Sequence, residues 1–331
     1  MSGFKKYKTF ITEKSDSLLA DKIKDVYLGI IDSMSMIKQQ HFLSRLSKSY
    51  GNKWKNKIKE LGSELALEVL DIFTVYKNGE VEGSVDSFIK MRNANNANVE
   101  SKKKGNQWVF DNREEVEIFL SYLEVLMKFN IVCRLKCEDS FKPNDIHEIR
   151  TWLIENWESK IDWVIENPEI FTMIPVQSIN IFYYMSSLKL MDPNIVDRRE
   201  IEFLDSLRNE YEGKLEDDIM FNNYLYALTH IIIGESWFYE YKLPLYKQKY
   251  GWLIEFLKGN RERIFEAVPD IVIEIGVVFV ICNEQTEANR YKKYTRSKIG
   301  DSGYIEPLDN TKGPEESEHT NILAIMLLKG I

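Results

Sequence analysis

The sequence predicts an all-α protein, and three observations lead to this prediction. Apolar residues recur three and four positions apart along most of the chain, which is the spacing of one helix face. Proline and glycine stand at the ends of these periodic stretches, and the links between the stretches are short. We therefore expect roughly ten to twelve helices in a single domain of residues 1–331, with antiparallel pairs that form an α/α toroid or a curved α-solenoid.

Each predicted helix rests on its own pattern. In the first helix, apolar residues from Leu18 to Met34 follow the capping candidates Ser15 and Asp16. Late in the chain, Pro269 occupies the favoured first turn of the strongly apolar helix at residues 270–284. The remaining helices are predicted at residues 54–76, 111–129, 144–167, 174–191, 197–211, 216–233, 245–256 and 261–268, and from residue 314 onward.

Residues 79–110 form the least regular part of the sequence. Residues 93–106 are rich in asparagine and lysine and predict a long exposed loop. The flanking stretches 87–91 and 107–110 are candidates for a small β-hairpin. We expect this region to be an irregular or hairpin insertion, whose loop is either a functional element or only a flexible link.

Composition excludes several classes of function. The net charge is −8 with both signs well mixed, which argues against a general nucleic-acid binder. The longest apolar run, residues 275–282, is far shorter than a membrane span, and the N-terminus has no signal-peptide pattern. The three cysteines are an odd count, and we interpret them as reduced thiols. We expect a soluble, cytoplasmic protein that binds neither nucleic acid nor membrane.

The usual motifs of cofactor chemistry are missing from the sequence. It contains no P-loop, GxGxxG, GxSxG or HExxH pattern, so nucleotide and phosphate chemistry of the usual kinds is not expected. Cys133 and Cys137 have no nearby histidine or second cysteine pair that would complete a zinc site. We predict no metal site and no cofactor.

Three stretches carry a resemblance to known proteins. They are ALTHIIIGESWFYE, PDIVIEIGVVFVICNE and GYIEP followed by EHTNILAIMLL, all in the last third of the chain. In style they resemble uncharacterised bacterial helical proteins of the α/α-toroid type, which repeat helix hairpins around a central axis. The chain lacks the DDxxD and DxDD motifs of terpene cyclases and the Cys-His-Gly set of lanthionine cyclases. The resemblance therefore implies a fold and no reaction.

Glu274 is the polar residue whose position most requires an explanation. It lies in a helix that is apolar nearly all round, and a buried carboxylate must be paired, protonated or directed at a polar cavity. Asp270 lies one turn earlier on the same face. Two neighbouring carboxylates can act as acid and base. The alternative is that Asp270 caps the helix and Glu274 pairs internally, with His230 or an arginine.

His230 lies in the middle of the apolar stretch 224–241. The helical wheel places it on one face with Asn223, Tyr226, Ile233 and Trp237, so it can point into a cavity as an acid or base. The alternative is a structural histidine with a satisfied hydrogen bond. We expect the helix to break at Gly234.

The C-terminal stretch supplies a further histidine. His319 shares a face with Ile322, Leu323 and Met326 and is expected to point inward, as a floor group of the cavity. The loop before it places Tyr304 and Glu306 as rim groups. The alternative is a plain C-terminal seal. His41, which follows two glutamines, is expected to be exposed.

Two hypotheses of function follow. The first is an enzyme with a cavity at one end of the helical array, which acts on a polar small molecule, glycan or peptide by carboxylate and histidine acid–base chemistry. The second is a non-catalytic module that binds a protein partner and uses the same buried polar groups to fix helix register. The candidate catalytic residues are Glu274, Asp270, His230 and His319, and the candidate substrate-binding residues are Tyr304, Glu306, Trp237 and Tyr226.

Overall fold

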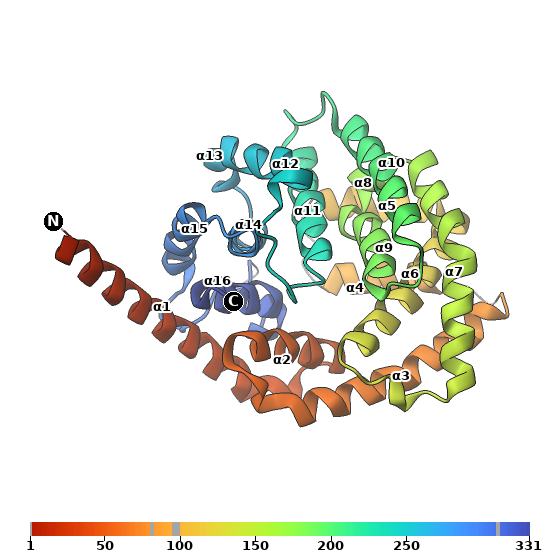
Figure 1. Ribbon diagram of the computed structural model, residues 1–331, viewed down its shortest axis with the longest axis horizontal. Helices are drawn as coiled ribbons and strands as arrows, with labels where there is room; N and C mark the ends of the chain where they lie inside the picture. The colour runs from red at the N-terminus through yellow and green to blue at the C-terminus, as the bar shows by residue number, and fades with distance from the viewer. Residues whose placement is uncertain (1, 80–82, 95–99, 309–311) are drawn as a thin grey trace. The chain divides into compact units, whose positions relative to one another are not determined.

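The computed structural model confirms the all-α class (Figure 1). It describes residues 2–79, 83–94, 100–308 and 312–331, and the side chains of these except residues 2–14, 91–94 and 100–102. Within these ranges it contains sixteen α-helices, four short 3-10 helices and no strand. The chain divides into two compact units. The first unit comprises Met1–Ile58 and Tyr239–Ile331, and the second comprises Lys59–Phe238.

The first unit is built around its C-terminal helix, α16 (Glu318–Lys329). This helix packs against α1 (Ser2–Ile30), α2 (Met36–Tyr50), α14 (Pro269–Ile281) and α15 (Gln285–Lys298), as Figure 1 shows. The other elements of this unit are η1 (Ile31–Ser33), η2 (Asn52–Trp54), α12 (Lys247–Gly259), α13 (Arg261–Ile264) and η4 (Pro314–Ser317). Helix α16 therefore joins elements from both ends of the sequence.

Helix α14 is buried because it is apolar on every face. All its residues from Ile271 to Ile281 are buried, including Glu274. Gly276 allows its neighbours to approach closely, since a Cβ there would lie 2.6 Å from a Leu327 methyl and 2.8 Å from Tyr291 Cβ. A close-packed interior leaves no room for such an atom. The same helix thus brings Glu274 into the core of the first unit.

A buried amide fastens the preceding loop to α16. The Asn321 side chain is fully buried, accepts a hydrogen bond from Ile305 N–H at 2.8 Å and donates to Ile305 O at 2.8 Å. It also donates to the Tyr27 hydroxyl at 3.1 Å, and that hydroxyl donates to Pro314 O at 2.6 Å. One side chain therefore ties α16 to α1 and to the loop around Ile305.

The second unit is built around α9 (Pro175–Leu188), which packs against α6 (Arg113–Arg134), α7 (Pro143–Glu166), α8 (Ile170–Met173) and α11 (Asp218–Glu235). Its other elements are α4 (Ser84–Ala94), α5 (Glu100–Asp111), η3 (Glu138–Ser140) and α10 (Pro193–Tyr211). Helix α3 (Lys55–Lys77) begins in the first unit and continues in the second. In the part of the chain that the structure describes, no helix is both long and apolar enough to cross a membrane.

The predicted β-hairpin is wrong. Residues 87–91 lie in α4 and residues 107–110 lie in α5. Val85 and Phe88 are both buried, and their spacing of three residues is helical. The predicted loop 93–106 is therefore helical up to Ala94 and from Glu100 onward, and residues 95–99 lie outside the described residues.

Two predicted helix ends also differ. Ser15 and Asp16 do not cap a helix, because α1 continues through them. Asp16 is buried and pairs with Arg296 at 2.5 and 2.9 Å, so its carboxylate serves a tertiary ion pair. Helix α11 does not break at Gly234 but ends at Glu235, and Gly234 instead makes room for the Tyr183 ring.

We predict that Asn321→Ala lowers the free energy of unfolding of the first unit by about 3 kcal/mol, because several buried polar groups lose their partner together. Urea unfolding followed by tyrosine and tryptophan fluorescence measures the effect. The matched control is Asn289→Ala, an exposed asparagine on α15. Equal stability of the two variants would contradict the role given to Asn321.

Candidate active site

The first unit brings three of the predicted catalytic residues together. His319 Nδ1 lies 2.9 Å from Asp270 Oδ1, and His319 Nε2 lies 3.8 Å from Glu274 Oε2. Thr320 Oγ1 also donates to Asp270 Oδ1, at 2.7 Å. Asp270 and Glu274 are one turn apart on α14, so both carboxylates reach the same imidazole. His319 is thus held between two acidic groups.

A second imidazole lies beside His319, and the sequence did not predict it. His41, on α2, has its Nδ1 2.8 Å from Glu318 Oε1, and its ring centroid is 5.3 Å from that of His319. The prediction that His41 is exposed is wrong, since only 24% of its side chain is accessible. The adjacent acidic and imidazole residues Glu318 and His319 could have drawn attention to this place. Nothing in the sequence, however, indicates that His41 on α2 contacts them.

The two imidazoles have pKa values shifted in opposite directions. Burial alone would lower the pKa of His319, but the Asp270 and Glu274 carboxylates raise it to about 9. Burial and the Arg45 guanidinium lower the pKa of His41 to about 4, despite its contact with Glu318. Burial would raise the pKa of Glu318, but His41, His319 and Arg45 hold it below its usual value. At neutral pH His319 is therefore cationic and His41 neutral.

These protonation states assign an acid and a base. A carboxylate only accepts hydrogen bonds, so His41 carries its hydrogen on Nδ1 and keeps a lone pair on Nε2. His319 carries a hydrogen on each ring nitrogen. Both rings are partly accessible, with 24% of the His41 side chain and 39% of the His319 side chain exposed. A pair of groups with separated pKa values is the usual arrangement for general acid–base catalysis.

His230 belongs to the second unit, where it contacts a buried asparagine. Its Nδ1 lies 2.9 Å from Asn180 Oδ1, which joins α11 to α9. Tyr226 is half-buried on the same helix. His41, Asp270, Glu274, Glu318 and His319 all belong to the first unit.

Trp237 lies at the end of the second unit, in an unusual stretch of backbone. Trp237, Phe238 and Tyr239 have φ angles of +54°, +53° and +74°, in the left-handed region that such residues rarely adopt. In the second unit Lys189 Nζ lies 4.1 Å from the Trp237 ring, and Arg134 lies 5.1 Å from the Phe238 ring. These cations cover two of the three rings.

The two predicted rim residues lie on the loop that Asn321 holds. Tyr304 is half-buried and packs edge-on against Tyr27, with ring centroids 6.3 Å apart. Glu306 is exposed. Within the described residues, the ring contacts of Tyr304 are with Tyr27 and not with the two imidazoles.

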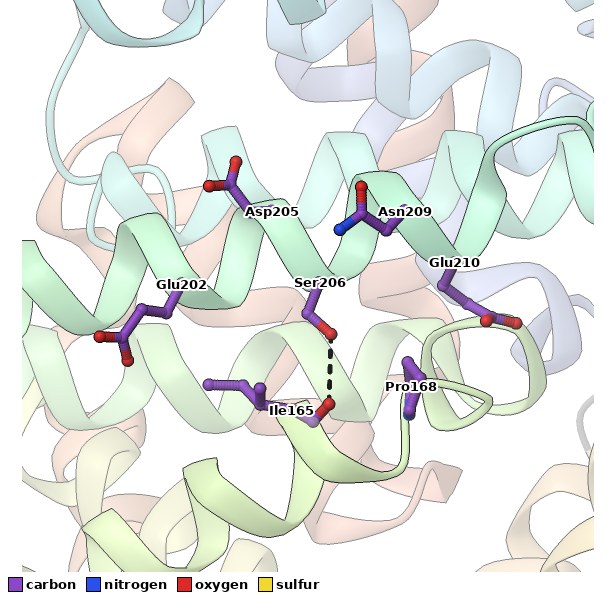
Figure 2. Close-up of a pocket in the computed structure, with 7 residues that line it drawn as sticks. All are labelled: Ile165, Pro168, Glu202, Asp205, Ser206, Asn209 and Glu210. Carbon is purple, nitrogen blue, oxygen red and sulfur yellow. Dashed lines mark hydrogen bonds between the residues drawn. The ribbon is translucent and has the colours of Figure 1, made fainter.

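The second unit carries a shallow groove of about 460 Å³ along α10 (Figure 2). Glu202, Asp205 and Glu210 project from α10 around it, and Ser206 Oγ donates to Ile165 O at 3.4 Å. Glu202 and Asp205 are exposed and Glu210 pairs with Lys214, which is what a solvated helix face also presents. We therefore assign no function to this groove.

The histidine, cysteine and acidic side chains of the described residues do not form a metal site. Among them, no group of three or more histidine, cysteine, aspartate or glutamate side chains is arranged to hold a metal ion. His41, Glu318, His319 and Asp270 instead satisfy one another as two imidazole–carboxylate pairs.

The chain belongs to a protein family that is defined by one domain. Residues 20–330 match the family model described as Domain of unknown function (DUF3541). The match includes both imidazoles and all three carboxylates of the cluster. No curated protein and no solved structure matches the chain.

We predict that stability is greatest near pH 6.5 and falls on both sides. The raised pKa of His319 contributes stability that is lost as pH rises from about 6.5 to about 9. The lowered pKa of His41 contributes stability that is lost as pH falls from about 6.5 to about 4. Melting temperatures across this range measure both limbs. His319→Gln should remove the fall in melting temperature above pH 6.5, and His41→Gln should remove the fall below it. Unchanged pH dependence in both variants would contradict the assignment.

Glu274→Gln should lower the pKa of His319, because one of its two anions is removed. The expected change is a downward shift of about one unit, read from the imidazole C–H signals in NMR spectra. The chain has only four histidines, so the signals can be assigned by single substitutions. Glu284→Gln, a carboxylate that pairs with Lys258, is the control. A His319 titration that is the same in both variants would show that Glu274 does not act on it.

Proposed function

We propose that the protein is an enzyme that catalyses proton transfer with the adjacent imidazoles of His41 and His319. The observation that carries this proposal is that each ring is fixed at Nδ1 by a carboxylate while their pKa values lie on opposite sides of neutrality. A module that only needed to fix helix register would gain nothing from this separation. The substrate class is a polar small molecule, glycan or peptide.

In this proposal the two histidines are the catalytic residues. His41 Nε2 accepts a proton from the substrate or from water, and cationic His319 donates one to the leaving group or developing anion. Asp270, Glu274 and Glu318 are positioning residues, because they contact the imidazoles and hold their orientation and charge. This assignment replaces the direct acid and base roles that the sequence suggested for Asp270 and Glu274.

Three further predictions from the sequence belong to this proposal. The α/α-toroid type, the bacterial origin and the cytoplasmic location remain predictions. The free state of Cys133, Cys137 and Cys282 supports a reducing compartment.

The proposal predicts a rate that is flat between about pH 4 and pH 9 and falls outside this range, because turnover needs neutral His41 and cationic His319. A panel of chromogenic glycosides, esters and peptides, followed by mass spectrometry of metabolite mixtures, identifies a substrate. His41→Gln and His319→Gln should each lower kcat by about 10²- to 10⁴-fold.

Two histidine substitutions serve as controls. His147→Gln changes an exposed histidine and should leave kcat unchanged. His230→Gln removes the hydrogen bond to Asn180 and should affect stability more than kcat. Full turnover by both His41→Gln and His319→Gln would contradict the proposal and favour a binding module.

A further inference from the structure

We propose that Thr320 is a positioning residue of the proposed site, and that its hydroxyl acts through Asp270 to make cationic His319 a stronger proton donor. This inference rests on the proposed function and adds to it a residue that regulates its acid. Two observations carry it. Thr320 and His319 share one oxygen atom of Asp270, and the two donors are neighbours in the chain.

The hydroxyl and the imidazole compete for the same acceptor. Asp270 Oδ1 lies 2.7 Å from Thr320 Oγ1 and 2.9 Å from His319 Nδ1, and both groups donate to it. Both donors lie in the first turn of α16, while Asp270 lies in the first turn of α14. A change in the charge of one donor therefore alters the strength of the hydrogen bond that the other makes.

The strength of the hydroxyl bond depends on the protonation state of His319. While the ring is a cation, the ion pair compensates the charge of Asp270. When the ring gives its Nε2 proton to the substrate, the electron pair of that N–H bond stays on the ring, which becomes neutral and keeps its Nδ1–H on Asp270. The carboxylate then has no cationic partner in the ring, and a hydroxyl bonds more strongly to an uncompensated anion. Thr320 therefore stabilises the state after proton transfer more than the state before it.

This difference makes release of the proton easier. The Asp270 and Glu274 carboxylates raise the pKa of His319 to about 9, which is high for an acid that works near neutral pH. A donor that favours the neutral ring lowers this pKa, because it stabilises the deprotonated state. Thr320 thus offsets part of the effect of the two carboxylates, which hold the ring but also retain its proton.

Thr320 has no charge, so its effect can be separated from the effects of the charged groups around His319. These groups are Asp270 and Glu274 on α14, His41 and Arg45 on α2, Glu318 on α16, and Tyr239, which interacts with both carboxylates of α14. Asp270 also has an interaction beyond its two donors, so removal of the hydroxyl does not leave it held by His319 alone. A substitution of Thr320 therefore removes one hydrogen bond and changes no charge.

The test is the titration of His319 in the full chain, read from imidazole C–H signals in NMR spectra, which needs no substrate. Thr320→Val nearly keeps the shape of the side chain but removes the donor, and it should raise the His319 midpoint by about half a unit. Thr320→Ser keeps the hydroxyl and should titrate as wild type. Thr295→Val is the control and should also titrate as wild type, because this buried threonine on α15 bonds to the backbone of Tyr291.

A double substitution shows whether the effect passes through Asp270. In an Asp270→Asn background the shared acceptor carries no charge, so Thr320→Val should leave the His319 midpoint nearly unchanged. A shift of the same size in both backgrounds would show that the hydroxyl acts on His319 by another route, and would overturn the inference.

The direction of the shift also decides. A His319 midpoint that is unchanged in Thr320→Val would overturn the inference, and so would a lower one, which would show that the hydroxyl only keeps Asp270 oriented toward the ring. If Thr320→Val does not fold, Thr320→Ala removes the same donor and is read in the same way. Failure of the proposed function looks different, because the midpoint would rise in Thr320→Val while His41→Gln and His319→Gln retained full turnover.

Discussion

The placement of one carboxylate inside an apolar helix is the constraint on which the first unit depends. Glu274 is 1% exposed and lies in a helix whose other buried residues are apolar or glycine. A charged group in that position needs a cationic neighbour, and His319 provides it from α16. This pair joins α14 to α16, and Gly276 allows the close contact between the two helices at Leu327.

Helix α16 combines two tasks that are separated by two residues. His319 and Glu318 hold the imidazole cluster, while Asn321 fastens α1 and the loop around Ile305. The amide network is fully buried and satisfied, so it makes the start of α16 rigid. Rigid support of this kind suits the proposed acid–base role, because a small displacement of a catalytic group lowers the rate.

The chemical difference between His41 and His319 arises from their surroundings and not from their residue type. The Arg45 cation lowers the pKa of both rings, but two carboxylates act on His319 and only one on His41. The same imidazole is therefore stabilised as a cation in one place and as a neutral ring 5.3 Å away. The proposed function depends on this contrast, because it needs one imidazole as the acid and the other as the base.

The sequence by itself determined the all-α class, the burial of the helix around Glu274, and the need of that carboxylate for a partner. These follow from periodicity and from the cost of burying charge, which are local properties. Only the tertiary structure decided the partners. His41 and Glu318 are 277 positions apart, and no local pattern joins α2 to α16. Likewise, helical periodicity in residues 84–94 and 100–111 was hidden by their polar composition, and tertiary packing of Val85 and Phe88 settled it.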